Sequence, residues 1–238
     1  MSGHSKWSSI KHKKALTDAK KGKVFSRLST FISIAAKHGG DPTMNPNLRL
    51  HIEKAKQAGM PKENIERAIK RGTGELGGAH LEEVFYEAYG PEGVGIIIEG
   101  VTDNKNRTVA EIKAVLNKYN GKLAETGAVS YLFEKKGVIV VSTENNDIDE
   151  VSLLAIDAGA EDIITDDEHL IMYTLPGELE KVKKNLEENH ITIISAEITL
   201  EPKNTVQISD GKKESIGRLV ELLDDLEDVT EISTNADV

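Results

Sequence analysis

The sequence is 238 residues long, with 38% hydrophobic and 29% charged residues and a formal net charge of −10. It is typical of a soluble globular protein of one to three domains. The lack of cysteine excludes disulfides, thiolate metal sites and a cysteine nucleophile. With no run of about 18 apolar residues and no apolar signal-peptide core, we expect a cytoplasmic protein that does not bind membranes.

The positive charge is concentrated at the N-terminal end. Residues 1–72 hold 16 Lys and Arg against 5 Asp and Glu, a net charge of +11. Residues 73–238 hold 14 against 35, a net charge of −21. This asymmetry indicates a basic module for a polyanion. The same polyanion repels the acidic part, so we expect that part to face away from it or toward a protein partner.

The first 72 residues are predicted to form a small helical bundle. Helical spacing of apolar residues, or helix-ending signals, mark the stretches KVFSRLSTFISIAAKHGG, NPNLRLHIEKAKQAG and MPKENIERAIKRG. Asn45 is the expected N-cap of the second helix, and Gly59 and Gly72 are expected to end the second and third. The glycine-rich segment at 72–80 is predicted to be a linker.

Beyond the linker, strands and helices alternate. Residues 137–200 follow the order β-α-β-β-α-β of a ferredoxin-like domain. Residues 94–134 are predicted to form a strand, a helix and a strand, and so are residues 204–233. Together these two segments give the same order again, which predicts one α+β domain that is interrupted by the ferredoxin-like domain of residues 137–200. The alternative, two consecutive half-domains, leaves each sheet too small to cover its apolar face.

The expected fold class is therefore multidomain α and α+β: an N-terminal helical bundle plus two ferredoxin-like α+β domains, one inserted in the other. The expected domains are a basic helical domain of residues 1–78, a discontinuous α+β domain of residues 79–134 plus 203–238, and an acidic ferredoxin-like domain of residues 135–202.

The basic N-terminal segment is the main candidate for binding nucleic acid. Binding to a phosphate backbone needs a high density of cations, and Trp7 and His12 can stack on unpaired bases. Lysines supply point charges, which predicts weak sequence discrimination. The plainer alternative is a solvated helix face with Trp7 packed in the bundle. The candidate residues are Lys6, Trp7, Lys11, His12, Lys13, Lys14, Lys20, Lys21, Lys23 and Arg27, together with Arg67, Lys70 and Arg71 of IERAIKRG.

A second candidate is the loop in GVTDNKNRT, which joins a strand to a helix. Asp103, Asn104 and Asn106 can form side-chain turns, and Asn106 or Thr108 can cap the following helix. That structural role competes with contact to a partner, for which Arg107 would face a phosphate or carboxylate.

Motifs for catalysis and for metal or nucleotide binding are weak. GTGELGG fits GxGxxG, but it follows a helix and precedes a polar linker. TDDEH at 165–169 is better explained as a hairpin tip than as a metal site. HExxH, GxSxG and P-loop patterns are missing. We therefore expect no enzyme activity, no small-molecule substrate, no cofactor and no metal.

Several stretches resemble the YebC/PmpR family of bacterial proteins, whose mitochondrial relatives activate translation. They are SGHSKWSSIKHKKALTDAKKGKVFSRL, GGDPTMNPNLRL, GMPKENIERAIKRGTGE, YGPEGVGIIIE, TDNKNRT and GAVSYLFEKKG. Gly59 replaces the family's commoner Asn, and both residues tolerate a left-handed turn. The resemblance implies a helical domain and two α+β domains, one discontinuous, with the basic residues of 6–27 as nucleic-acid contacts.

The combined interpretation is a regulator of gene expression that binds nucleic acid. The resemblance implies either a DNA-binding transcriptional regulator or a ribosome-binding translation factor that relieves stalling, notably at proline runs. We place DNA first and ribosomal RNA as a near-equal alternative. The sequence shows neither an arginine-rich recognition helix nor a dimer seam, which favours recognition of backbone or shape. A protein-interaction module is a further alternative, because fold alone assigns no role.

Overall fold

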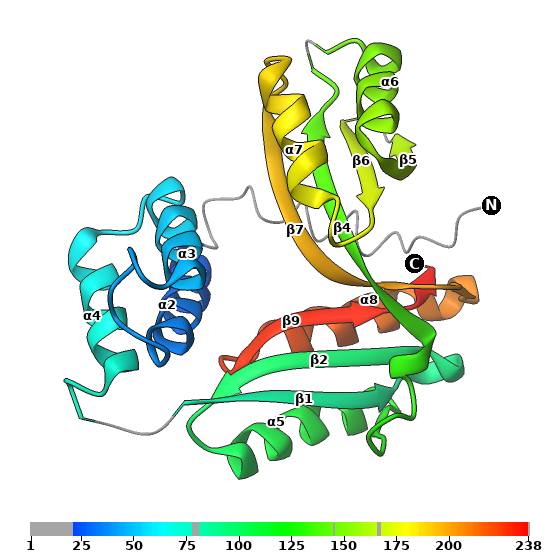
Figure 1. Ribbon diagram of the computed structural model, residues 1–238. Coiled ribbons are helices and arrows are strands. Elements are labelled where there is room, and N and C mark those ends of the chain that lie inside the picture. The colour runs from blue at the N-terminus through cyan, green and yellow to red at the C-terminus, as the bar shows by residue number, and fades with distance from the viewer. Residues whose placement is uncertain (1–20, 78–80, 145, 166–167, 238) are drawn as a thin grey trace.

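The structure, a computed structural model, contains a helical bundle and two α+β domains (Figure 1). The bundle lies to one side of the first sheet, and the second α+β domain stands above that sheet. The expected fold class, with one α+β domain inserted in the other, is confirmed. The residues that the structure describes are 21–77, 81–144, 146–165 and 168–237.

Three helices of the described chain form the bundle around one apolar core. Asn45 caps the second helix as expected, because its side chain accepts a hydrogen bond from the Leu48 backbone N–H at 3.1 Å. The helices are α2 (Lys21–Ala36), α3 (Pro46–Gln57) and α4 (Lys62–Thr73). The buried apolar residues of this core are Ile32, Ala35, Ala36, Leu48, Ile52, Ala55, Met60, Ile65 and Ala68.

Helices α2 and α4 approach each other closely at Gly72. A Cβ at this position would lie 2.2 Å from the Ser33 carbonyl oxygen, and the Ser33 hydroxyl donates to the Ala68 carbonyl at 2.9 Å. The expectation that Gly72 ends the helix is wrong, because α4 continues to Thr73. The left-handed residue is Gly74, with φ of 83°. Gly72 is thus a helix-packing residue.

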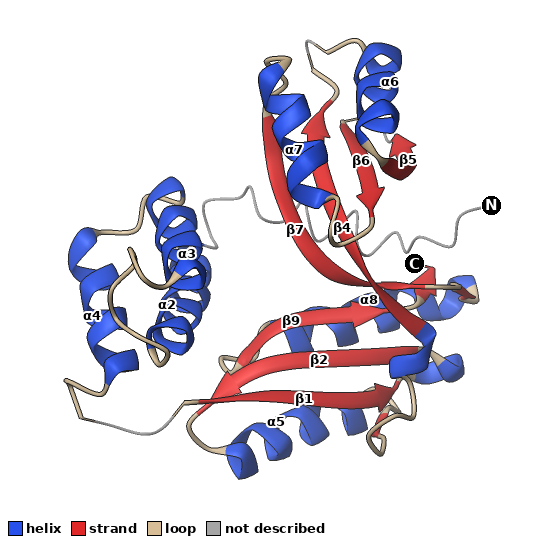
Figure 2. Ribbon diagram, viewed as in Figure 1, coloured by secondary structure: helices blue, strands red, loops and turns tan. Residues whose placement is uncertain are grey.

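The first sheet is antiparallel, with strand order β3-β1-β2-β9. Helices α5 and α8 cover one face of it (Figure 2), and the core between them includes Ile96, Ile98, Ile112 and Leu219. The elements are β1 (Glu82–Tyr89), β2 (Gly95–Thr102), α5 (Lys105–Lys118), β3 (Lys122–Leu123), α8 (Asp210–Asp224) and β9 (Val229–Thr234). Two short strands, β8 (Val206–Gln207) and β10 (Ala236–Asp237), pair in parallel.

The strand content of this domain differs from the expectation in three places. Strand β1 is not expected from the sequence, and residues 128–132, expected to be extended, form a turn with a short 3-10 helix. The strand expected from residue 204 is only the short β8, which pairs with β10 and does not join the first sheet. The buried Glu87 carboxylate explains the turn, since it accepts hydrogen bonds from the backbone N–H groups of Gly127, Val129 and Ser130 at 2.6–2.9 Å. Those donors are therefore used by a side chain instead of a neighbouring strand.

The second α+β domain has the expected order β-α-β-β-α-β. Its antiparallel sheet has the strand order β5-β6-β4-β7, and α6 and α7 pack on one face. The elements are β4 (Phe133–Ser142), α6 (Ile148–Ala158), β5 (Ala160–Thr165), β6 (His169–Thr174), α7 (Leu179–Glu188) and β7 (Ile193–Pro202). Strands β5 and β6 pair as a hairpin, and the tip at 166–167 lies outside the described residues.

The two α+β domains are joined by a two-stranded ribbon. Strands β4 and β7 pair from Phe133 and Pro202 at one end to Val141 and Ile193 at the other, and they run from one sheet to the other (Figure 1). The domain limits expected after residues 134 and 202 therefore lie within β4 and at the end of β7. The exact domain limits stay a prediction. No helix in the described ranges is long and apolar enough to span a membrane.

The crossing at Gly72 predicts a local loss of stability on adding one methyl group. Gly72→Ala should weaken the packing of α2 on α4 by about 2 kcal/mol, because neither backbone can yield easily. Gly217→Ala is the matched control: this helical glycine has no heavy atom within 4 Å of its Cβ position. It should stabilise α8 by up to about 1 kcal/mol. Amide hydrogen exchange of α2 and α4 measures both effects, and unchanged protection in Gly72→Ala would contradict the packing role.

Candidate nucleic-acid interface

Only part of the predicted basic surface lies within the described residues. Lys21 and Lys23 lie at the start of α2, and Arg27 lies one turn further along the same helix. The other candidates of the N-terminal segment lie outside the described residues: Lys6, Trp7, Lys11, His12, Lys13, Lys14 and Lys20. Their role as phosphate contacts stays a prediction.

Arg27 connects the helical bundle to the first α+β domain. Its Nη2 donates to the Asp224 carboxylate at 2.6 Å and to the Asp224 carbonyl at 3.0 Å, at the end of α8. Both side chains are about three-quarters buried. The expectation that the acidic domains face away from the basic segment does not hold at Arg27, because this guanidinium already has a carboxylate partner. Its contact with phosphate therefore competes with an interdomain ion pair.

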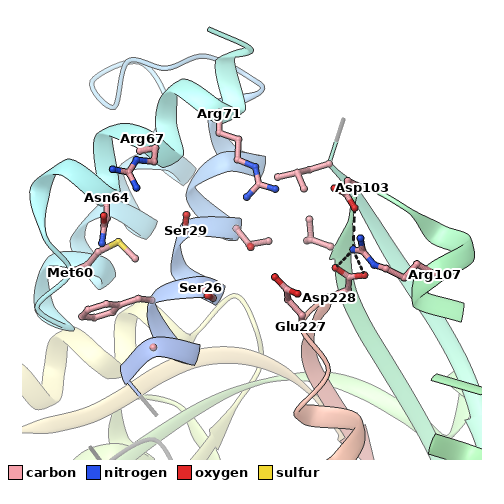
Figure 3. A pocket seen from close by; sticks show the side chains of 15 residues that line it. Ser26, Ser29, Met60, Asn64, Arg67, Arg71, Asp103, Arg107, Glu227 and Asp228 are labelled. Atoms are coloured by element: carbon pink, nitrogen blue, oxygen red, sulfur yellow. Dashed lines mark hydrogen bonds and ion pairs between the residues drawn. The ribbon is translucent and has the colours of Figure 1, made fainter. Parts of the chain in front are cut away.

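Arg67, Lys70 and Arg71 are all exposed residues of α4. Arg67 and Arg71 line a cleft of about 400 Å³ between the helical bundle and the first α+β domain, whereas Lys70 lies outside that lining (Figure 3). Neither arginine side chain has a hydrogen bond or an ion pair within the described part of the chain. Two cations thus lie at the cleft with no carboxylate partner among the described residues.

The opposite wall of the cleft includes residues of the GVTDNKNRT segment, the second candidate site from the sequence. Asp103, from the loop between β2 and α5, and Arg107, from the first turn of α5, line the cleft together with Glu227 and Asp228 before β9. Arg107 Nη2 lies 3.1 Å from Asp103 Oδ1 and 2.9 Å from both oxygens of Asp228. The fold therefore brings together two motifs that the sequence only suggested separately.

The remaining residues of that loop have structural roles. Asn104 is the N-cap of α5, because its side chain accepts a hydrogen bond from the Arg107 backbone N–H at 3.1 Å. The expectation that Asn106 or Thr108 caps the helix is therefore wrong. Asn106 is exposed on the first turn of α5 and lies outside the residues that line the cleft. Thr108 is buried, and its hydroxyl donates to Asp228 at 2.7 Å.

Asp228 is the buried centre of the acidic wall, with 7% of its surface exposed. Its Oδ2 also accepts a hydrogen bond from the Thr102 hydroxyl at 3.0 Å. Burial raises the pKa of Asp228, but the hydrogen bonds from Thr108, Arg107 and Thr102 together outweigh it and hold the pKa below its ordinary value. The carboxylate is ionised at neutral pH and fixes the guanidinium of Arg107. No local signal in the acid-rich LLDDLEDVT distinguishes it from its neighbours.

Neutral polar side chains complete the helical wall. None of them has a side-chain hydrogen bond within the described residues, so they face the cleft as available donors and acceptors. Sequence reasoning missed them because isolated hydroxyls on a polar helix face carry no pattern. They are Ser26, Ser29, Thr30 and Asn64. Among the described residues, no cluster of His, Asp and Glu could hold a metal ion.

Comparisons with known proteins match nearly the whole chain. A family model described as the TACO1/YebC protein N-terminal domain matches residues 5–75, and one described as the TACO1/YebC second and third domain matches residues 81–236. A probable transcriptional regulatory protein of Halothermothrix orenii is 50% identical over 100% of this chain and 96% of its own length. One from Persephonella marina is 55% identical, with 96% and 91% covered.

A solved structure also matches the fold. The crystal structure of a conserved hypothetical protein from Aquifex aeolicus is 46% identical in sequence, with a TM-score of 0.87 over 98% of this chain and 96% of that chain. The arrangement of all three domains is thus similar to that of a known protein.

Asp228→Asn should destabilise the protein by about 1–3 kcal/mol at neutral pH, because Arg107 loses its buried carboxylate. The folded pKa of Asp228 lies below the ordinary 3.8, so the ionised group stabilises the fold above that value. This contribution is lost as the pH falls through the folded pKa. Urea unfolding at decreasing pH should therefore show the two proteins converging. Asp157→Asn, at an exposed carboxylate, should change stability by less than about 0.5 kcal/mol, and a pH-independent gap for Asp228→Asn would contradict the assignment.

Proposed function

Because the chain belongs to the TACO1/YebC family, we propose that it regulates gene expression by binding nucleic acid, with DNA in transcription as the first target. Relatives of this chain are named probable transcriptional regulatory proteins. Their names support a role in regulation, without specifying the nucleic acid that is bound. The resemblance that the sequence suggested is confirmed by the family models.

The observation that carries the proposal is the separation of charge along the chain. Residues 1–72 have a net charge of +11 in a chain of net charge −10. Of their cations, Arg67, Lys70 and Arg71 are exposed on a single helix. Neutralising phosphates with such cations releases condensed counterions, which supplies affinity without reading sequence. The acidic domains then orient the protein on the polyanion or bind a protein partner.

Ribosomal RNA is the second candidate target. One observation favours it: Arg67 and Arg71 line a cleft between domains, and a recognition helix for the DNA major groove presents its side chains on an open convex face. Recognition of RNA relies instead on backbone shape and on unpaired segments. DNA and ribosomal RNA would both offer phosphates to the same cations, and they differ in whether those phosphates belong to a DNA or an RNA strand.

The charge separation predicts a steep dependence of binding on salt. If about six phosphate contacts form on duplex DNA, the slope of log affinity against log salt should be about −5. Reversal of Lys11, Lys13, Lys14 and Lys21 to Glu should abolish binding in fluorescence anisotropy without unfolding the protein. The matched control reverses four exposed lysines of the acidic domains, Lys118, Lys181, Lys184 and Lys212. Equal losses in both variants would mean that net charge alone drives binding.

The choice between DNA and RNA predicts different behaviour in sedimentation. A DNA-binding regulator should leave the fast-sedimenting fraction of a cell extract after DNase treatment and stay there after RNase treatment. Immunoblots across a sucrose gradient measure both. Co-migration with the large ribosomal subunit that survives DNase would overturn DNA as the main target and establish the RNA alternative.

A further inference from the structure

We propose that the cleft between α4 and the loop joining β2 to α5 holds the phosphodiester backbone of an unpaired strand, so that the protein binds nucleic acid that is single-stranded or locally opened. This inference rests on the proposed function and deepens it, because it names the form of nucleic acid and the site that takes it. Three features carry it: the cations of the two walls, the charge balance of the cleft and its size.

The helical wall offers contacts suited to a phosphodiester. Arg67 and Arg71 are one turn apart on α4, and both are free of carboxylates within the described residues. An arginine guanidinium is a planar fork that binds phosphate oxygens through two parallel hydrogen bonds. The four neutral polar side chains described above add donors and acceptors beside them. Solubility alone does not require arginines and neutral polar side chains to line the same cleft.

The opposite wall offers a cation that is already oriented. Within the described residues, the Arg107 side chain forms its hydrogen bonds through Nη2, which is directed at Asp103 and Asp228. Its Nε and Nη1 donors have no partner among those residues, and 45% of the side chain is exposed. The carboxylates that hold Arg107 therefore lower the entropic cost of presenting it to a ligand. A strand in the cleft would be contacted from both walls.

The charge balance of the cleft selects among phosphates. Three arginines face Asp103, Glu227 and Asp228, so the formal charges cancel. A phosphodiester carries one negative charge, whereas a terminal phosphate or a nucleoside triphosphate carries two or more and would need an excess of positive charge that this cleft does not provide. The Glu227 carboxylate can accept a hydrogen bond from a ribose hydroxyl or base amine. An internal backbone phosphate is therefore the best match.

The size of the cleft selects the unpaired form. Its volume of about 400 Å³ lies at the lower end of the range for small-ligand sites, about 300–1,000 Å³. A nucleotide of a flexible strand can enter such a space with its phosphate between the two walls, whereas a duplex, which is wider than one nucleotide, would contact only the mouth of the cleft. Because the walls belong to two domains joined by the Arg27–Asp224 pair, the bound strand would bridge both domains.

The test compares strands and variants at fixed salt by fluorescence anisotropy. The probes are a short labelled strand of mixed sequence, in ribose and deoxyribose forms, each with and without a 5′-phosphate, and the corresponding duplexes. The cleft variant is Arg67→Ala with Arg71→Ala. The matched control removes two exposed cations of the same bundle that lie outside the cleft and outside the candidate contacts, Lys56→Ala with Lys62→Ala. Circular dichroism establishes that both variants are folded, and the ribose and deoxyribose arms identify the natural strand.

The cleft variant should bind the single strand at least about tenfold more weakly, with a salt slope reduced by about 1.4 for two lost contacts. The control should change affinity less than about threefold, and the 5′-phosphate should add nothing. Equal losses in the two variants, equal losses for single strand and duplex, or binding that requires the 5′-phosphate would each overturn the inference. If the wild-type protein binds none of the probes, both the proposed function and this inference are overturned. If the cleft variant binds the single strand as tightly as the wild type, only this inference is overturned.

Discussion

The buried carboxylate of Asp228 is the interaction on which the geometry of the cleft depends. It joins the end of β2, through Thr102, to the first turn of α5, through Arg107 and Thr108. Burial makes an ionised group costly unless each oxygen is hydrogen-bonded, and here three donors meet that requirement. The same bonds hold Arg107 at the cleft. One residue before β9 thus determines both the local packing and the position of a cation offered to a ligand.

Charge also organises the contact between domains. The helical bundle is basic and the remainder acidic, so electrostatic attraction acts between parts of a single chain. At Arg27 and Asp224 that attraction forms an ion pair, whereas the α4 arginines at the cleft have none among the described residues. An external phosphate would have to displace Asp224 in order to bind Arg27. It could bind the cleft arginines of α4 without displacing a carboxylate of the described residues.

Sequence reasoning reached the fold class but not the site. The ferredoxin-like order of 137–200 was readable because its strands and helices have clean periodicity, and Asn45 was readable as a cap from its neighbours. Strand β1 was missed because Phe85 and the buried Glu87 share one face, which blurs the alternation. The cleft could not be predicted, since it depends on how α4 is placed against the loop before α5. No local pattern encodes a contact between segments so far apart.

The paired strands β4 and β7 have a mechanical consequence for the inserted domain. The chain passes between the two domains twice, through β4 and β7, and these strands are hydrogen-bonded to each other up to Phe133 and Pro202. Sliding one strand along the other would break these backbone hydrogen bonds, so the link resists shear in the plane of the ribbon. It flexes more easily along the perpendicular direction, in which the pairing is preserved. The paired link therefore constrains the orientation of the acidic domain more than a single-chain tether would.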